Sequence, residues 1–145
     1  MTITEALVGA WQLETCEARA DDGPPLLPLG EKPRGLLLYT ADQAMSVAIM
    51  RAGRAPFGSN DILAGTEHEK ALAAETYLSY AGRWTVSGER IKHTITISLF
   101  PNWVGTVQER RLKLDGSRLE LSTDPIQFGE QTRVARMIWR REASL

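Results

Sequence analysis

The fold expected for this chain is decided by the stretch His93-Thr-Ile-Thr-Ile-Ser-Leu-Phe-Pro-Asn-Trp-Val-Gly-Thr-Val-Gln-Glu-Arg-Arg111. Its first half alternates apolar and polar residues, the period-two pattern of a strand with one buried face. Pro101 and Asn102 then predict a turn, because proline presets the backbone and asparagine bonds the chain two residues on. A second alternating run follows, so the stretch predicts two antiparallel strands. His93 shares the buried face of the first strand with Ile91, Ile95, Ile97 and Leu99.

The period-two pattern recurs on both sides of this stretch. We expect strands at residues 9–17, 35–40, 44–50, 80–86, 91–100, 105–114, 119–123 and 132–140. Most intervals are too short for parallel crossovers, and Asp115-Gly116 is a strong hairpin signal. The sequence therefore predicts an all-β fold: an eight-stranded antiparallel up-and-down barrel, whose closure removes exposed sheet edges.

The parity of the first two strands predicts which side chains face inward. In the first, Trp11, Leu13 and Thr15 alternate with a second set that contains Cys16. In the second strand we expect Leu36 and Leu38 to line the interior, which places Tyr39 on the opposite parity.

Two segments between the strands are distinctive. Residues 20–33 hold four prolines and two glycines, so we expect a long surface connection there. Thr66 and Glu69 form a capping box, which predicts one short helix at about residues 67–78, between strands three and four. Its apolar stripe is modest, so we expect the helix to lie over one end of the barrel, where it can act as a lid.

Composition predicts one ordinary globular domain spanning residues 1–145. The chain is 43% hydrophobic and 24% charged, with a net charge of −1. So small a net charge supplies no field to attract a nucleic acid backbone or an anionic membrane. We therefore expect neither as a partner, and a homodimer is possible.

The N-terminus and the single cysteine bear on the cellular compartment. Residues 1–9 lack the basic and apolar regions of a secretory signal, and no run of about 18 apolar residues is present. Cys16 has no second cysteine with which to form an internal disulfide. These features lead us to expect a cytoplasmic protein.

Five segments of the chain, in this order, resemble a known family. They are residues 28–35, 38–40, 45–47, 77–84 and 93–111, preceded by Gly9-Ala10-Trp11. Together they resemble the bacterial and fungal lipocalin-like domain family, and the Gly-x-Trp opening resembles that of calycins, where the tryptophan closes one barrel end. The resemblance implies a calycin-type barrel with an internal cavity. The family usually has glycine where this chain has Gln43, in the turn between strands two and three.

His93 and Arg110 are the residues best suited to chemistry inside such a barrel. Burial favours a neutral imidazole, which can bind a hydroxyl or carbonyl group or act as a general base. Arg110 and Gln108 share the inward parity of Leu112 and Leu114. A buried guanidinium needs a carboxylate or an anionic ligand. The alternatives are a core histidine paired with another polar group, and a structural or rim arginine.

Aromatic and apolar residues complete the candidate binding site. Met45 lies on one apolar strand face, and Tyr80 and Trp84 lie on another; each face either fills the core or lines a cavity. Asn102 and Trp103 are explained by turn chemistry, or Trp103 covers a bound ring at the barrel mouth. The candidate ligand-binding residues are Tyr39, Met45, Tyr80, Trp84, His93, Asn102, Trp103, Gln108 and Arg110.

These residues support three hypotheses for function. The first is a protein that binds a small, mainly apolar molecule with a hydroxyl, carbonyl or carboxylate group. The second is a cofactor-free cyclase, isomerase or hydrolase of a small carbonyl compound, with His93 as acid or base and Arg110 stabilising an oxyanion. The third is a filled barrel that mediates association through an exposed Trp139 or Phe128. We expect no cofactor and no metal, because the two histidines have no ligand set at an established spacing.

Overall fold

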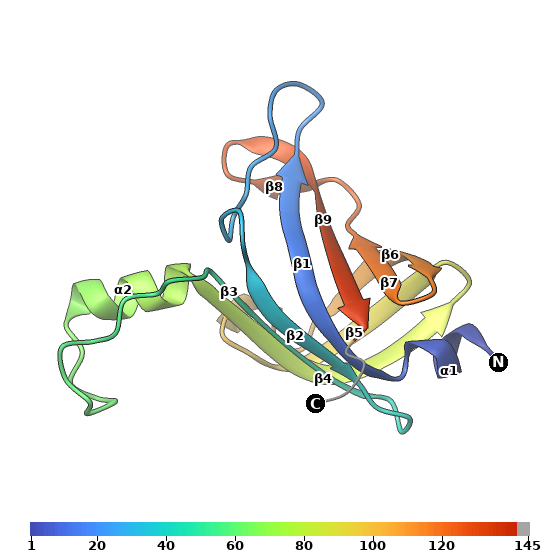
Figure 1. The fold of residues 1–145 in the computed structure, drawn as a ribbon, viewed down its shortest axis with the longest axis horizontal. Coiled ribbons are helices and arrows are strands. Elements are labelled where there is room, and N and C mark those ends of the chain that lie inside the picture. The colour runs from blue at the N-terminus through green and yellow to red at the C-terminus, as the bar shows by residue number, and fades with distance from the viewer. Residues whose placement is uncertain (142–145) are drawn as a thin grey trace.

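The computed structural model describes residues 1–141, which form a closed antiparallel β-barrel (Figure 1). The barrel strands are β1 (Gly9–Arg19), β2 (Arg34–Tyr39), β3 (Ala44–Met50), β4 (Tyr77–Ser87), β5 (Arg90–Ser98), β6 (Val107–Asp115), β7 (Arg118–Ser122) and β9 (Gln131–Arg141). Each pairs with the next, and β9 returns to pair with β1. The predicted eight-stranded barrel is confirmed; the end of the expected 1–145 domain lies outside the described residues.

Three short elements add to the predicted set. α1 (Ile3–Leu7) begins with a capping box between Thr2 and Glu5, and β8 (Ile126–Phe128) pairs only with β9. The predicted Pro-Asn-Trp turn is a 3-10 helix, η1 (Pro101–Trp103). These elements are too short to produce the periodic signals that identify longer ones.

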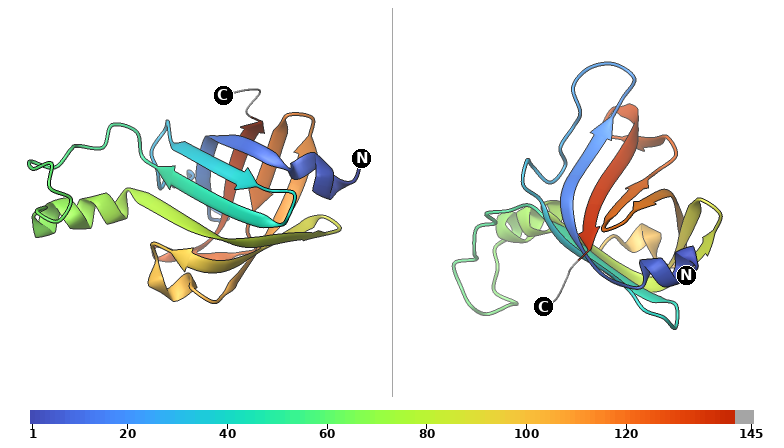
Figure 2. Two further views of the ribbon diagram at one scale, coloured as in Figure 1. Left: turned by 90° about the horizontal axis from the view of Figure 1, so that it is seen from below. Right: turned by 45° about the vertical axis from the view of Figure 1, so that its right-hand side comes forward.

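α2 (Glu67–Glu75) is the predicted helix, but its position differs from the expectation. The Thr66–Glu69 capping box is present, and the helix ends early because β4 already begins at Tyr77. It has no buried residue, and Figure 1 and the left view of Figure 2 show it projecting away from the barrel. The expectation of a lid over one end is therefore wrong, because the weak apolar stripe gives the helix little to bury.

The inward face of β2 is the reverse of the predicted one. Leu37 and Tyr39 are buried, whereas Leu36 and Leu38 are 39% and 38% exposed. Three consecutive leucines satisfy either parity, so the pattern of apolar residues does not decide the face. Tyr39 on the inner face has a hydrogen-bond partner there, as a buried hydroxyl requires.

β1 contains a bulge that places Cys16 in the core. The register with β9 shifts between Leu13 and Thr15, so the alternation restarts one residue later. Cys16 and Ala18 are therefore buried and Thr15 is exposed, contrary to the predicted parity.

A second bulge lies on β5, close to His93. The pairing of β4 with β5 shifts between Ala81 and Gly82. Ile91, His93 and Ile95 face inward as predicted, but Ile97 is 68% exposed and Leu99 is also exposed. The extra residue in the bulge shifts the alternation by one position, so the side chains of Ile97 and Leu99 face outward.

Trp11 lies at the barrel end that α1 covers. Its indole Nε1 donates to the carbonyl of Leu7 at 3.0 Å, and the Arg141 guanidinium lies 4.2 Å from its ring centroid. Trp11 and Leu7 are fully buried. The tryptophan thus closes this end, as the resemblance implied.

Candidate functional site

A cavity of about 40 Å³ lies inside the barrel. This exceeds the roughly 10–15 Å³ that one water molecule requires. Most of its wall is apolar, and a few polar groups converge on it, which is the lining chemistry of small-molecule sites. Its volume is well below the roughly 300–1,000 Å³ of such sites, so a ligand must displace wall side chains to enter. The lining residues are Leu37, Val47, Ile49, Leu78, Tyr80, His93, Trp103, Arg110, Leu121, Met137 and Trp139.

His93 is held between two tyrosines. Its Nε2 atom lies 2.7 Å from the hydroxyl oxygen of Tyr39, and its Nδ1 atom lies 2.8 Å from that of Tyr80. The three side chains come from β5, β2 and β4, and all are buried. Both ring nitrogens of the histidine therefore have partners within the protein.

Burial keeps all three of these groups neutral at ordinary pH. It lowers the pKa of His93 to about 3, with a smaller contribution from the positive charge of Arg110. It raises the pKa of Tyr39 well above its ordinary value and also raises that of Tyr80, while Arg110 opposes both shifts. The site therefore contains no negative charge from these residues.

A neutral histidine between two hydroxyls has one donor and one acceptor nitrogen. With the proton on Nδ1, His93 donates to Tyr80 and accepts from Tyr39, so the Tyr80 proton is free. With the proton on Nε2, the Tyr39 proton is free instead. Of the two tyrosines, Tyr80 lines the cavity and Tyr39 does not. Only the Nδ1 tautomer therefore directs a free hydroxyl proton toward a ligand.

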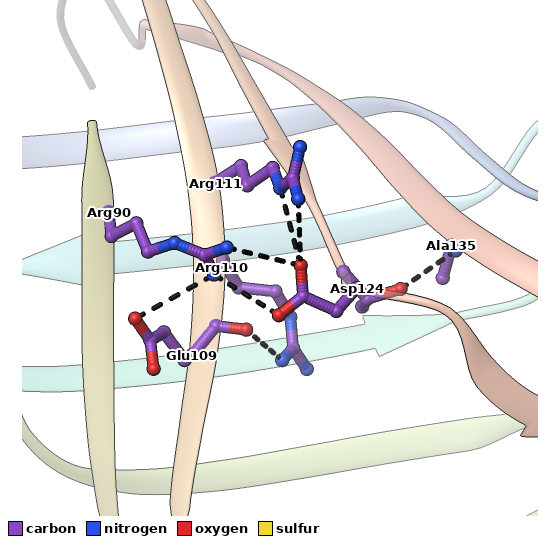
Figure 3. A network of polar contacts seen from close by, with 7 residues as sticks. Arg90, Glu109, Arg110, Arg111, Asp124 and Ala135 are labelled. Atoms are coloured by element: carbon purple, nitrogen blue, oxygen red, sulfur yellow. Dashed lines mark hydrogen bonds and ion pairs between the residues drawn. The ribbon is translucent and has the colours of Figure 1, made fainter.

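Arg110 brings a positive charge to the cavity wall without a carboxylate partner among residues 1–141. Its Nη1 atom donates to the backbone carbonyl of Glu109 at 3.0 Å. Figure 3 shows the neighbouring carboxylates of Glu109 and Asp124 engaged by Arg90 and Arg111. Arg110 therefore keeps donors for another partner, since a guanidinium has five N–H groups.

Trp139 has a buried donor without a partner. Its side chain is 1% exposed, it lines the cavity, and its indole Nε1 has no hydrogen-bond partner within the described part of the chain. A buried polar group without a partner costs about 1–3 kcal/mol.

A family model for a lipocalin-like domain matches residues 8–142. This chain is a member of the lipocalin-like domain family. A relative, the 4'-hydroxy-3'-methoxypropiophenone carrier protein of Aspergillus oryzae, is 37% identical over 106 residues, which cover 67% of this chain and 96% of the relative.

One solved structure of a distant protein also aligns with the lipocalin-like barrel. It is an uncharacterized protein from Bacteroides eggerthii, 13% identical, and the match covers 93% of this chain and 98% of that one with a TM-score of 0.46. So distant a likeness says nothing about function.

The lipocalin-like barrel brings part of the predicted site together. Tyr80, His93, Trp103 and Arg110 line the cavity, and Tyr39 reaches it through its hydrogen bond to His93. The other four predicted residues, Met45, Trp84, Asn102 and Gln108, do not line the cavity.

Trp84 packs behind the site, with its ring centroid 4.6 Å from that of Tyr39 and its indole nitrogen bonded to the Thr40 carbonyl. Met45 is buried in the core, Gln108 is half-buried, and Asn102 is exposed; none of these lines the cavity.

Trp139 is the most informative lining residue that the sequence did not reveal. It was considered only as a surface residue of the filled-barrel hypothesis, yet it is buried in the cavity wall beside Leu37, Leu121 and the half-buried Met137. The alternation of Met137 and Trp139 with Arg136 and Arg140 carried this signal, but the buried Ile138 between them obscures it.

Residues 1–141 show no group of three or more potential metal-ligating side chains. In the same residues no helix is long and apolar enough to cross a membrane.

Proposed function

We propose that this lipocalin-like protein binds a small aromatic molecule with a carbonyl or hydroxyl oxygen inside its barrel. The observation that carries the proposal is a mostly apolar cavity wall on which two side chains keep spare hydrogen-bond donors: Arg110 beyond its bond to Glu109 and, in one tautomer, Tyr80. An apolar body packed against the walls, with an acceptor oxygen at these donors, satisfies both parts of the site.

The relative from Aspergillus oryzae supports the same class of ligand. Its name describes a carrier of 4'-hydroxy-3'-methoxypropiophenone, an aromatic ketone with a phenolic hydroxyl. Such a molecule has a flat apolar body and oxygen acceptors, which match the chemistry of the cavity here. We therefore use it as the first probe.

The catalytic hypothesis has less support from the site. Both nitrogens of His93 are occupied by tyrosine hydroxyls, and its pKa of about 3 makes it a weak base. A general base needs a nitrogen within reach of the substrate and a pKa near the working pH. An exposed Trp139 or Phe128 would support the filled-barrel hypothesis, but Trp139 is buried and Phe128 is half-buried.

The test is calorimetric titration of the protein with 4'-hydroxy-3'-methoxypropiophenone, comparing wild type with a cavity-filling variant. Leu121 lines the cavity, so Leu121→Phe should weaken binding about tenfold or more by occupying ligand space. Leu36→Phe is the matched control, because Leu36 points outward and is 39% exposed. Near-UV circular dichroism establishes that both variants keep the native packing.

Saturable binding that Leu121→Phe impairs and Leu36→Phe does not would support the proposal. No binding to wild type, or an equal effect of the two variants, would refute it for this class of ligand. The cytoplasmic location and the homodimer stay predictions.

A further inference from the structure

We propose that the barrel binds its ligand as an anion, namely the phenolate of an acylphenol, with the negative oxygen beside Arg110. The inference rests on the proposed function and adds the protonation state of the ligand to it. Three observations lead to it: the positive charge on the cavity wall, the excess of hydrogen-bond donors over acceptors there, and the pairing of the nearby carboxylates with other arginines.

The charge balance of the cavity is positive. Tyr80 and His93 line it from β4 and β5, Tyr39 on β2 lies behind His93, and burial keeps all three neutral. Cys16, in the core on β1, is also neutral because burial raises its pKa to about 11. The residues that β3, β7, β9 and η1 contribute to the wall are not titratable. Arg110 is therefore the one formal charge on the cavity wall in the described residues.

Hydrogen-bonding capacity points the same way. The Arg110 guanidinium has donors left after its bond to the Glu109 carbonyl, and the Trp139 N–H has none of its capacity used. When the proton lies on Nδ1, the Nε2 atom of His93 accepts from Tyr39 and the Tyr80 oxygen accepts from Nδ1. The Tyr39 oxygen accepts no bond from His93 in this tautomer, but Tyr39 does not line the cavity. A ligand group here gains most when it only accepts hydrogen bonds, as an oxyanion does.

Neighbouring carboxylates are engaged elsewhere. Glu109 lies 3.7 Å from Arg90, and Asp124 lies 3.2 Å from both Arg90 and Arg111 (Figure 3). Glu14 pairs with Arg140. No carboxylate oxygen lies within ion-pair distance of Arg110 among residues 1–141, so the half-buried guanidinium is available to pair with an anionic ligand.

A phenolate suits this cavity better than a compact anion. In an acylphenol the negative charge spreads through the ring to the carbonyl oxygen, so less hydration is lost when the anion enters an apolar space. A carboxylate concentrates its charge and loses more hydration on burial. The wall offers one cation among mostly apolar side chains, which fits the delocalised anion.

The experiment measures the pKa of the phenol of 4'-hydroxy-3'-methoxypropiophenone free and bound, from the absorbance change on ionisation. Binding is measured across the same pH range, and 3',4'-dimethoxypropiophenone serves as the analogue that cannot ionise. We expect the bound pKa to fall by about one unit or more, which corresponds to about tenfold tighter binding of the phenolate than of the phenol.

Three variants assign the effect to Arg110. Arg110→Gln should abolish most of the shift, and Arg110→Lys should keep most of it because the charge remains. Arg111→Gln is the matched control: it removes the same charge from the adjacent residue of β6, whose exposed side chain pairs with Asp124 outside the cavity. It should leave the bound pKa unchanged.

The outcomes separate this inference from the proposed function. If 4'-hydroxy-3'-methoxypropiophenone and 3',4'-dimethoxypropiophenone bind equally and the pKa of the phenol group does not fall, the anion proposal is wrong while the proposed function stands. If neither compound binds, both fail. Tighter binding of benzoate than of the acylphenol at neutral pH would overturn the choice of a phenolate.

Discussion

The hydroxyl of Tyr39 and the Nε2 atom of His93, 54 residues apart in the chain, are joined by a hydrogen bond of 2.7 Å inside the barrel. Tyr80 occupies the other ring nitrogen at 2.8 Å. This pairing satisfies a buried histidine without a charge and orients a hydroxyl at the cavity wall. Its consequences for stability and binding can be measured separately.

Acid should destabilise the protein through His93. Its pKa is about 3 in the folded protein and about 6.5 ordinarily, so between these values the unfolded chain binds more protons. The stabilising contribution is complete above about pH 6.5 and is lost as pH falls toward 3, costing about 2 kcal/mol between pH 7 and pH 5. Urea unfolding of wild type and His93→Gln at both pH values measures this loss.

His68 is the matched control for that measurement, because it lies exposed on α2. His68→Gln should retain the wild-type pH dependence, whereas His93→Gln should lose most of it. Should His93→Gln fail to fold, NMR titration of the imidazole in wild type measures the pKa directly. A His93 pKa near 6.5 would contradict the prediction.

The two tyrosines should differ in their effect on binding. If His93 carries its proton on Nδ1, Tyr80→Phe removes the hydroxyl that donates to the ligand and should weaken propiophenone binding about 5- to 30-fold. Tyr39→Phe should keep affinity within about threefold. It should still cost about 1–3 kcal/mol of stability by leaving Nε2 unpaired.

Calorimetry and urea unfolding measure the two effects, and ¹⁵N chemical shifts of His93 identify the tautomer. Greater loss of affinity in Tyr39→Phe than in Tyr80→Phe would overturn the assignment of Tyr80 as the hydroxyl that donates to the ligand.

Cys16 should be unreactive in the folded protein. Burial raises its pKa to about 11, and the side chain is 7% exposed. At pH 8 the thiolate fraction is then about 100-fold below that of an ordinary cysteine, and the thiolate is the reactive form. Reaction with a thiol reagent, followed with and without urea, should show at least that difference in rate. Similar rates would contradict burial of the thiol.

Gly82 should not tolerate a side chain, because the bulge brings two backbones together there. A Cβ atom at this position would lie 1.9 Å from the carbonyl oxygen of Thr94. Gly82→Ala should therefore cost about 3 kcal/mol or more in urea unfolding. Gly58→Ala is the control, since its Cβ would meet only Glu69 Oε2, at 3.9 Å, and should stay within about 1 kcal/mol. Equal effects would argue against the bulge.

Much of the fold follows from local pattern. Period-two alternation identified the eight barrel strands, and the capping box of Thr66 and Glu69 located the start of α2. Bulges on β1 and β5 were not predicted, because an extra residue changes parity without changing composition. For the same reason the inward positions of Cys16 and the exposure of Ile97 were missed.

The sequence by itself determined that the chain is an antiparallel barrel and that His93 and Arg110 face its interior, because alternation along one strand is a local property. Only the tertiary structure decided that Tyr39, rather than Leu36 and Leu38, faces inward and pairs with His93. It also decided that Trp139 joins the cavity wall and that the carboxylates near Arg110 pair with other arginines. These contacts join strands distant in the chain, and barrel closure and register set them.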